Sequence, residues 1–161
     1  MKTLYLIRHA KSDWNNGLKD FDRPLSGRGI SDASRIGKHL LNEGVVPNLI
    51  LSSSANRAIS TARLIAAEMV YAVEKIEENK NLYHASPKEM AREIWKVSNE
   101  VETLFVFGHN PGISELIGYL TEDWAELKTC CVAKISLEVD DWKALVRGTG
   151  TLKEIISPKE I

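Results

Sequence analysis

Short apolar runs alternate with stretches of helical periodicity along the chain, and this alternation restricts the fold more than any other feature of the sequence. Apolar runs typical of buried strands occur at Thr3–Ile7, Leu49–Leu51 and Thr103–Phe107, and a helical pattern follows each of them. Strands that alternate with helices form parallel sheets with helices packed on both faces. The sequence therefore predicts an α/β protein, a three-layer α/β/α sandwich with a mostly parallel central sheet.

The remaining elements are predicted as follows: helices over residues 26–44, 55–69, 86–97 and 111–120, and strands over residues 73–76, 132–139 and 151–156. The clearest helix start is Ser86-Pro87-Lys88-Glu89, which combines an N-cap serine, a proline at the first helical position and the glutamate of a capping box. Residues 132–139 alternate apolar and polar side chains, as half-exposed strands do. No repeat or linker interrupts the pattern, so residues 1–161 are predicted to form a single domain.

Charge and cysteine content restrict the partners and the compartment. The 161 residues carry 21 basic and 22 acidic side chains, a formal net charge of −1, which gives no reason to expect nucleic acid or a membrane as a partner. No apolar run approaches the ~20 residues that span a bilayer, and the first one is too short for a signal peptide. Cys130 and Cys131 are adjacent, which suits neither a disulfide nor a zinc site. We therefore expect a cytoplasmic protein. The sequence does not indicate how many subunits it has.

Two arginines and two histidines lie where predicted strands end. Arg8 and His9 follow the first strand directly. Arg57 lies in the first turn of the helix after the second strand, and His109 follows residues 103–107. Singly, Arg8 reads as a surface cation, Arg57 as a solvated helix residue and His109 as a turn residue. Jointly they indicate a site, because open α/β sheets bind ligands beyond the carboxyl ends of their strands.

This combination of side chains suits a phosphoryl group. Arginine offers planar, bidentate donors for phosphate oxygens. A neutral histidine can attack phosphorus and form a covalent intermediate, and a second, protonated histidine can stabilise charge on the equatorial oxygens. No acidic cluster resembles a metal site and no glycine-rich loop followed by lysine resembles a nucleotide cradle. We therefore expect hydrolysis with neither metal nor cofactor.

Several blocks of the sequence resemble the histidine phosphatase superfamily, and its SixA-like phosphohistidine phosphatase branch in particular. The first block has Ala10 where the family's Arg-His-Gly motif has glycine. The blocks are Leu6-Ile7-Arg8-His9-Ala10-Lys11-Ser12-Asp13-Trp14, Asp22-Arg23-Pro24-Leu25-Ser26 with Gly29, Ser53…Arg57-Ala58…Thr61-Ala62, Leu82-Tyr83-His84-Ala85-Ser86, Gly108-His109-Asn110-Pro111-Gly112, and Gly150…Leu152…Pro158. Together they cover essentially the whole chain.

The resemblance implies a fold and a role for each residue of the cluster. The fold would be phosphoglycerate-mutase-like with minimal insertions, its strand order reversing between the first strand and residues 103–107. His9 would be the nucleophile that becomes phosphohistidine, and Arg8, Arg57 and His109 would form the phosphate pocket. With so little sequence to build a lid, the pocket is expected to be open enough to admit a phosphorylated side chain on a protein.

The general acid is where this sequence departs from the family, many members of which use a glutamate. The nearest equivalent is His84, which reads equally well as an exposed residue beside a helix, and Glu78 is nearby. A missing acid suits phosphohistidine, since an imidazole leaving group has a pKa near 6.5 and an alkoxide needs a proton. Asn15 could touch phosphate or form a turn. Lys11 and Arg23 could line the pocket or be solvated, and for Arg23 the solvated interpretation is favoured.

The leading hypothesis is a metal-independent phosphatase that acts on phosphohistidine in a phosphorylated protein, such as a phosphorelay domain or phosphotransfer carrier. One alternative is a phosphomonoesterase for small molecules, and a mutase fits less well because it needs a closed pocket. A third, from a different class, is a catalytically weak phosphate-binding module, against which the intact His9 argues.

Overall fold

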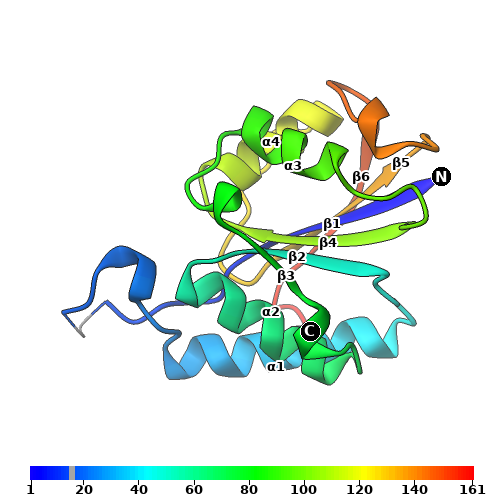
Figure 1. Cartoon of the computed structure of the whole chain (residues 1–161). Coiled ribbons are helices and arrows are strands. Elements are labelled where there is room, and N and C mark those ends of the chain that lie inside the picture. Colours follow the sequence, from blue (N-terminus) through cyan, green and yellow to red (C-terminus); the bar gives the residue numbers. More distant parts are fainter. Residues whose placement is uncertain (15–16) are drawn as a thin grey trace.

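The computed structural model describes residues 1–14 and 17–161, and these residues form a single six-stranded sheet (Figure 1). The strand order is β3-β2-β4-β1-β5-β6. The strands are β1 Lys2–Arg8, β2 Leu49–Ser53, β3 Glu77–Asn79, β4 Thr103–Gly108, β5 Val132–Leu137 and β6 Gly150–Ile156. The helices are α1 Gly27–Asn42, α2 Asn56–Glu68, α3 Pro87–Trp95 and α4 Gly112–Thr121, with 3-10 turns at η1 Asp20–Asp22, η2 Val73–Lys75, η3 Lys80–Leu82 and η4 Trp142–Ala144.

The layers are those that the alternation predicts. Helices α1 and α2 cover one face of the sheet and α3 and α4 cover the other (Figure 1). The strands β3, β2, β4 and β1 run parallel, whereas β5 and β6 are antiparallel to their neighbours. The α/β/α sandwich with a mostly parallel sheet is confirmed, and so is the strand-order reversal, because β4 inserts between β2 and β1.

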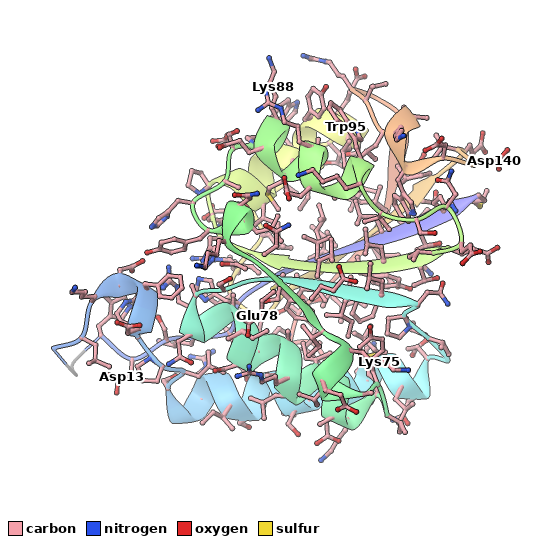
Figure 2. The ribbon with its side chains drawn as sticks, in the orientation of Figure 1. Asp13, Lys75, Glu78, Lys88, Trp95 and Asp140 are labelled. Carbon is pink, nitrogen blue, oxygen red and sulfur yellow. The ribbon has the colours of Figure 1, made fainter. Side chains whose placement is uncertain are left out.

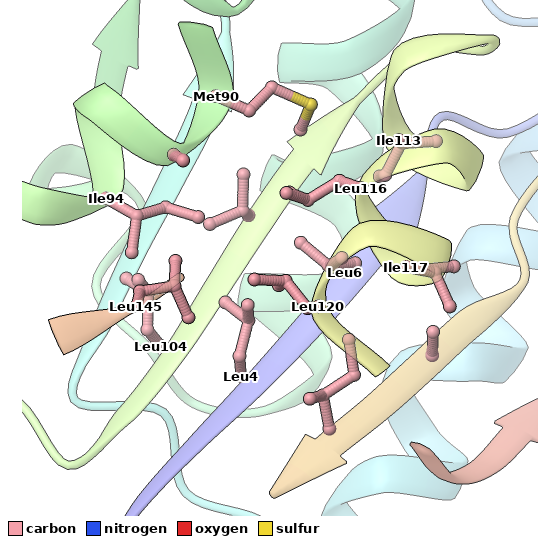
Figure 3. Close-up of a cluster of buried hydrophobic side chains, with 14 of the residues drawn as sticks. Leu4, Leu6, Met90, Ile94, Leu104, Ile113, Leu116, Ile117, Leu120 and Leu145 are labelled. Atoms are coloured by element: carbon pink, nitrogen blue, oxygen red, sulfur yellow. The ribbon is translucent and has the colours of Figure 1, made fainter. Parts of the chain in front are cut away.

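The central strands are buried on both faces, which holds their ends firmly in place. Along β1, Leu4 and Leu6 enter the core under α3 and α4, where Figure 3 shows them beside Leu116 and Leu120. Tyr5 and Ile7, which alternate with them, pack on the opposite face with α1 and α2. Each fully buried aliphatic side chain contributes roughly 1.5–3 kcal/mol relative to an exposed one. Residues at the ends of β1 and β4 are therefore anchored by packing.

Most predicted elements are present, but the strand predicted over residues 73–76 is wrong. Residues Val73–Lys75 form the 3-10 turn η2, and the third strand is Glu77–Asn79. The apolar Val73 and Ile76 pack against the core from outside the sheet, which explains the misleading pattern. Strand β3 is a polar edge strand paired with β2, so it carries no run of buried apolar residues.

The helix start at Ser86 is confirmed in atomic detail. The backbone N–H of Glu89 donates to Ser86 Oγ at 3.2 Å, and the N–H of Ser86 donates to Glu89 Oε1 at 3.0 Å. Cys130 and Cys131 are free, buried thiols, as their adjacency suggests. Within the part of the chain that the structure describes, no helix has the length and apolar character needed to cross a membrane.

Candidate active site

The pairing of β1 with β4 brings the two histidines side by side. Arg8 is the last residue of β1, Gly108 is the last residue of β4, and the two are partners in the parallel register. The next residues are His9 and His109, and the backbone N–H of His9 donates to the Gly108 carbonyl at 3.2 Å. Their ring centroids lie 5.2 Å apart. The predicted convergence of strand ends therefore places both rings at one edge of the sheet.

A cavity of about 390 Å³ opens at this edge. It is lined by all four residues predicted to form the site and by others from neighbouring loops: Arg8, His9, Arg57 and His109, with Lys11, Ser12, Trp14, Asp20, Arg23, His84, Asn110 and Thr129. Asn15 lies outside the described residues. The structure thus gathers the predicted cluster, together with Lys11 and His84, around a single hollow large enough for a phosphoryl group.

His9 is held in the form that a nucleophile needs. Its ring is buried, and Nδ1 lies 2.8 Å from the Ala10 carbonyl oxygen. Because a carbonyl only accepts, Nδ1 carries the proton and Nε2 keeps its lone pair. Burial, together with the positive charges of Arg57 and Arg8, lowers the pKa of His9 to about 4, although the hydrogen bond to Ala10 opposes this shift. His9 is therefore neutral at pH 7.

His109 is also neutral in the ligand-free pocket. Burial, reinforced by the neighbouring His9 and Arg57, lowers the pKa of His109 to about 3. Its Nε2 lies 2.8 Å from the Oγ of Ser53, and Nδ1 is buried with no hydrogen-bond partner among the described residues. The protonated form expected from the sequence requires an anion in the cavity to stabilise its charge. Ser53 belongs to a family-like block, but its role as support for His109 was not predicted.

Arg57 projects from the first turn of α2 toward the cavity, as expected. Its guanidinium is buried and donates to the backbone oxygen of Asp20 at 2.7 Å and to its Oδ2 at 3.1 Å. Arg8 donates to the Leu127 carbonyl at 3.3 Å. The Nε atoms of both arginines are buried without a partner among the described residues. Both arginines line the cavity, where guanidinium groups suit a ligand that carries several acceptor oxygens.

Asp20 lines the cavity beside the predicted cluster, and the sequence analysis did not predict it. Besides Arg57 it accepts hydrogen bonds from Arg23 at 3.0 Å and from the Tyr83 hydroxyl at 2.5 Å. The Tyr83 hydroxyl and the two guanidinium groups hold the pKa of Asp20 well below its usual range. Among the described residues that line the cavity, Asp20 is the only carboxylate. Its position three residues before Arg23 was the one available signal.

Arg23 is buried, so the favoured interpretation of it as a solvated residue is wrong. Its side chain donates to Ser12 Oγ and to Asp20, and its guanidinium carbon lies 3.5 Å from the centroid of the Trp14 ring. An isolated antiparallel bridge between Ser12 and Leu25 folds this loop back on itself. The loop therefore forms one wall of the cavity.

The two candidates for a general acid lie in different places. His84 lines the cavity, with an exposed ring that packs against Tyr83 at 3.9 Å between centroids and with Nε2 3.6 Å from Asp20 Oδ2. Glu78, labelled in Figure 2, lies on the edge strand β3 and pairs with Arg63 at 3.2 Å, and it does not line the cavity. The geometry thus retains His84 and does not bring Glu78 to the site.

Comparison with known proteins shows the family. A model of the histidine phosphatase superfamily (branch 1) matches residues 4–96. An uncharacterized chloroplastic protein of Arabidopsis thaliana is 30% identical over 151 residues, which cover 88% of this chain and 69% of that protein. The chain belongs to the histidine phosphatase superfamily.

Solved structures agree on the fold. The protein histidine phosphatase SixA, in complex with tungstate, superimposes with a TM-score of 0.85 at 20% identity over 98% of both chains. A mycobacterial glucosyl-3-phosphoglycerate phosphatase in complex with VO3 gives a TM-score of 0.72 at 17% identity, over 96% of this chain and 98% of that one. The fold is the SixA-like, phosphoglycerate-mutase-like one that the resemblance implied, and the family supports a phosphatase activity.

Proposed function

We propose that this protein is a phosphohistidine phosphatase that works through a covalent intermediate on His9 and needs no metal. The observation that carries the proposal is the state of His9, which is buried, neutral and oriented by the Ala10 carbonyl, beside Arg8, Arg57 and His109. A neutral imidazole with its Nε2 lone pair available, next to unpartnered guanidinium N–H groups, suits attack on a bound phosphoryl group.

The reaction proceeds in two displacements. The phosphoryl oxygens bind Arg8, Arg57 and Nδ1 of His109, and the lone pair of His9 Nε2 attacks phosphorus. The bond from phosphorus to the leaving nitrogen breaks, and its electron pair stays on that nitrogen. Water then attacks the phosphohistidine at His9, which releases inorganic phosphate and returns the electron pair to Nε2.

The choice of phosphohistidine as substrate follows from the protons that the site can supply. Asp20 is the only carboxylate among the described lining residues, and its low pKa makes it a poor proton donor, so the exposed His84 is the one candidate general acid that remains at the cavity. An imidazole that already carries a proton on its second nitrogen leaves as a neutral ring, whereas an alkoxide must be protonated. The open side of the cavity at the exposed His84 also suits a side chain presented by a protein.

The experiment that tests this proposal is a comparison of kcat/KM across leaving groups. The substrates are a phosphohistidine peptide, an aryl phosphate, a sugar phosphate and phosphoserine, each assayed with EDTA and without added metal. We expect the peptide and the aryl phosphate to react far faster than the two alkyl esters. A preference for the sugar phosphate would indicate the phosphomonoesterase, and the absence of any phosphoenzyme on His9 would indicate a binding module.

A further inference from the structure

A second, strongly basic hollow lies beside the catalytic cavity. It has a volume of about 170 Å³, and the residues that matter in its lining are Lys11, Arg28, Asp32, Lys128, Thr129 and Lys159. Lys11 and Thr129 also line the catalytic cavity, so the two hollows are neighbours. A substrate whose phosphoryl group is bound at His9 could therefore extend directly into this basic hollow.

The four cations come from four separate segments of the chain. Lys11 follows β1, Arg28 is in the first turn of α1, Lys128 precedes β5, and Lys159 follows β6. Asp32 lies 3.7 Å from Arg28 and is shared with Arg35 at the same distance. Among the described residues, the amino groups of the three lysines form no ion pair. In a chain with a net charge of −1, this local excess of positive charge attracts anions.

The opposite flank of the catalytic cavity carries the other sign of charge. A hollow of about 280 Å³ there shares His84, His109 and Asn110 with the catalytic cavity and is lined by Glu89 and Glu115. The mouth of the site is thus basic on one side and acidic on the other. This arrangement favours one orientation of a charged substrate over the reverse.

We infer that the basic hollow is a subsite for carboxylates of an acidic protein segment that surrounds the phosphorylated side chain. The inference rests on the proposed function and adds a substrate class to it. The cations are exposed, and most are lysines, which are flexible and strongly hydrated. Such groups suit several loose contacts to an acidic surface. A second phosphate of a small molecule would instead call for buried, bidentate arginines like Arg57.

The test uses two phosphohistidine peptides that differ in the residues around the phosphohistidine, one with aspartate and glutamate on both sides and one with asparagine and glutamine. We expect the wild-type kcat/KM to be about tenfold higher for the acidic peptide at low salt. The preference should shrink as salt screens the charges. In the triple variant Arg28→Glu, Lys128→Glu and Lys159→Glu, the two peptides should react equally.

A matched control separates the hollow from net charge. Lys38→Glu, Lys75→Glu and Lys153→Glu change the net charge by the same amount, at exposed positions that do not line these hollows. This control should keep the preference for the acidic peptide. If the glutamate triple variant does not fold, the milder triple variant with glutamine at positions 28, 128 and 159 should still lose most of the preference.

A second readout does not require phosphohistidine to be the substrate. The unphosphorylated acidic peptide should inhibit hydrolysis of an aryl phosphate by the wild type and not by the triple variant. Such inhibition without any phosphohistidine turnover would support the subsite and overturn the proposed function. Equal rates for both peptides with no selective inhibition would overturn the subsite. The subsite for carboxylates would also be overturned if the wild type did not distinguish the two peptides but preferred a sugar bisphosphate over the monophosphate, and if the triple variant lost that preference.

Discussion

The two ends of β1 each carry a cation, which is buried at the amino end and half-buried at the carboxyl end, and the two cations differ in how fully their hydrogen bonds are satisfied. At the amino end, Lys2 is 4% exposed and donates to the carbonyls of Asn99 at 2.5 Å and Val101 at 3.0 Å. Its ammonium also lies 5.7 Å from the ring centroid of Trp142. At the carboxyl end, the Nε of Arg8 is buried without a partner among the described residues. Lys2 thus has partners for its ammonium group, whereas Arg8 donates to the Leu127 carbonyl but keeps one N–H without a partner.

This difference distinguishes scaffold from site. A buried donor without a partner destabilises a protein by about 1–3 kcal/mol, so such groups persist where a ligand satisfies them. Three buried polar atoms have no partner among the described residues, the Nε of Arg8, the Nε of Arg57 and the Nδ1 of His109, and all three side chains line one cavity at the carboxyl edge of the sheet. A tetrahedral oxyanion provides acceptors for several such donors at once. The pattern of satisfied and unsatisfied groups therefore supports the proposed phosphoryl site at this edge.

The largest expected effect at the carboxyl end is that of His9→Ala. Loss of a nucleophile removes the covalent route, and we expect kcat to fall by roughly 10⁴-fold or more. The fold should be intact, since His9 fills no structural role beyond its bond to Ala10. Mass spectrometry under acid-free conditions should find a phosphoryl adduct on the wild type and none on the variant. A variant that retains most of its activity would contradict the mechanism.

The next largest effect is expected for Arg57→Lys. Lysine keeps the charge but loses the planar pair of donors, and loss of one transition-state donor typically lowers the rate by about 100-fold. The comparison variant is Arg63→Lys, at an exposed arginine on the same helix that pairs with Glu78. It should behave like the wild type. Equal kcat/KM for both variants would mean that Arg57 does not bind the phosphoryl group.

The sequence predicts the cluster at the carboxyl edge of the sheet because its residues directly follow regular strands. The positions of Arg8, His9 and His109 follow from strand burial and the carboxyl-edge rule, both visible as runs of apolar residues. Asp20 and the buried state of Arg23 are set by specific hydrogen bonds within an irregular loop, which no periodicity reveals.

The incorrect prediction of the third strand over residues 73–76 has a related cause. An edge strand with one neighbour can be short and polar, so β3 leaves almost no pattern in the sequence. Val73 and Ile76, just before it, pack on the core without joining the sheet. Their apolar side chains are the reason that a strand was predicted over residues 73–76.

The buried histidines should also make stability depend on pH. The pKa values of His9 and His109 are lowered to about 4 and about 3, so between those values and about 6.5 the unfolded chain binds more protons than the folded one. The free energy of unfolding therefore rises with pH across this window and decreases as the pH falls. At a pH below both pKa values of His9, folded and unfolded, this residue alone lowers the free energy of unfolding by about 3 kcal/mol. Urea unfolding of the wild type and of His9→Ala from pH 4 to 7 should show a weaker slope in the variant.

The smallest effect is expected at the amino end of β1, where Lys2→Met should lower the free energy of unfolding only slightly. Methionine keeps the apolar stem over Trp142 but removes the donor, leaving the Asn99 carbonyl without that bond. The Val101 carbonyl retains a bond from Trp142 Nε1 at 2.9 Å, so we expect a loss of only about 1–2 kcal/mol in the free energy of unfolding. Because Lys2 is remote from the cavity, kcat/KM should be unchanged.

Arg8→Met should show the reverse, with stability equal to or above that of the wild type and activity reduced at least 100-fold. Urea titration and kinetics on both variants measure this. If Arg8→Met is as destabilised as Lys2→Met, the cation at the carboxyl end is structural as well, and the inference from unsatisfied donors to a ligand site fails.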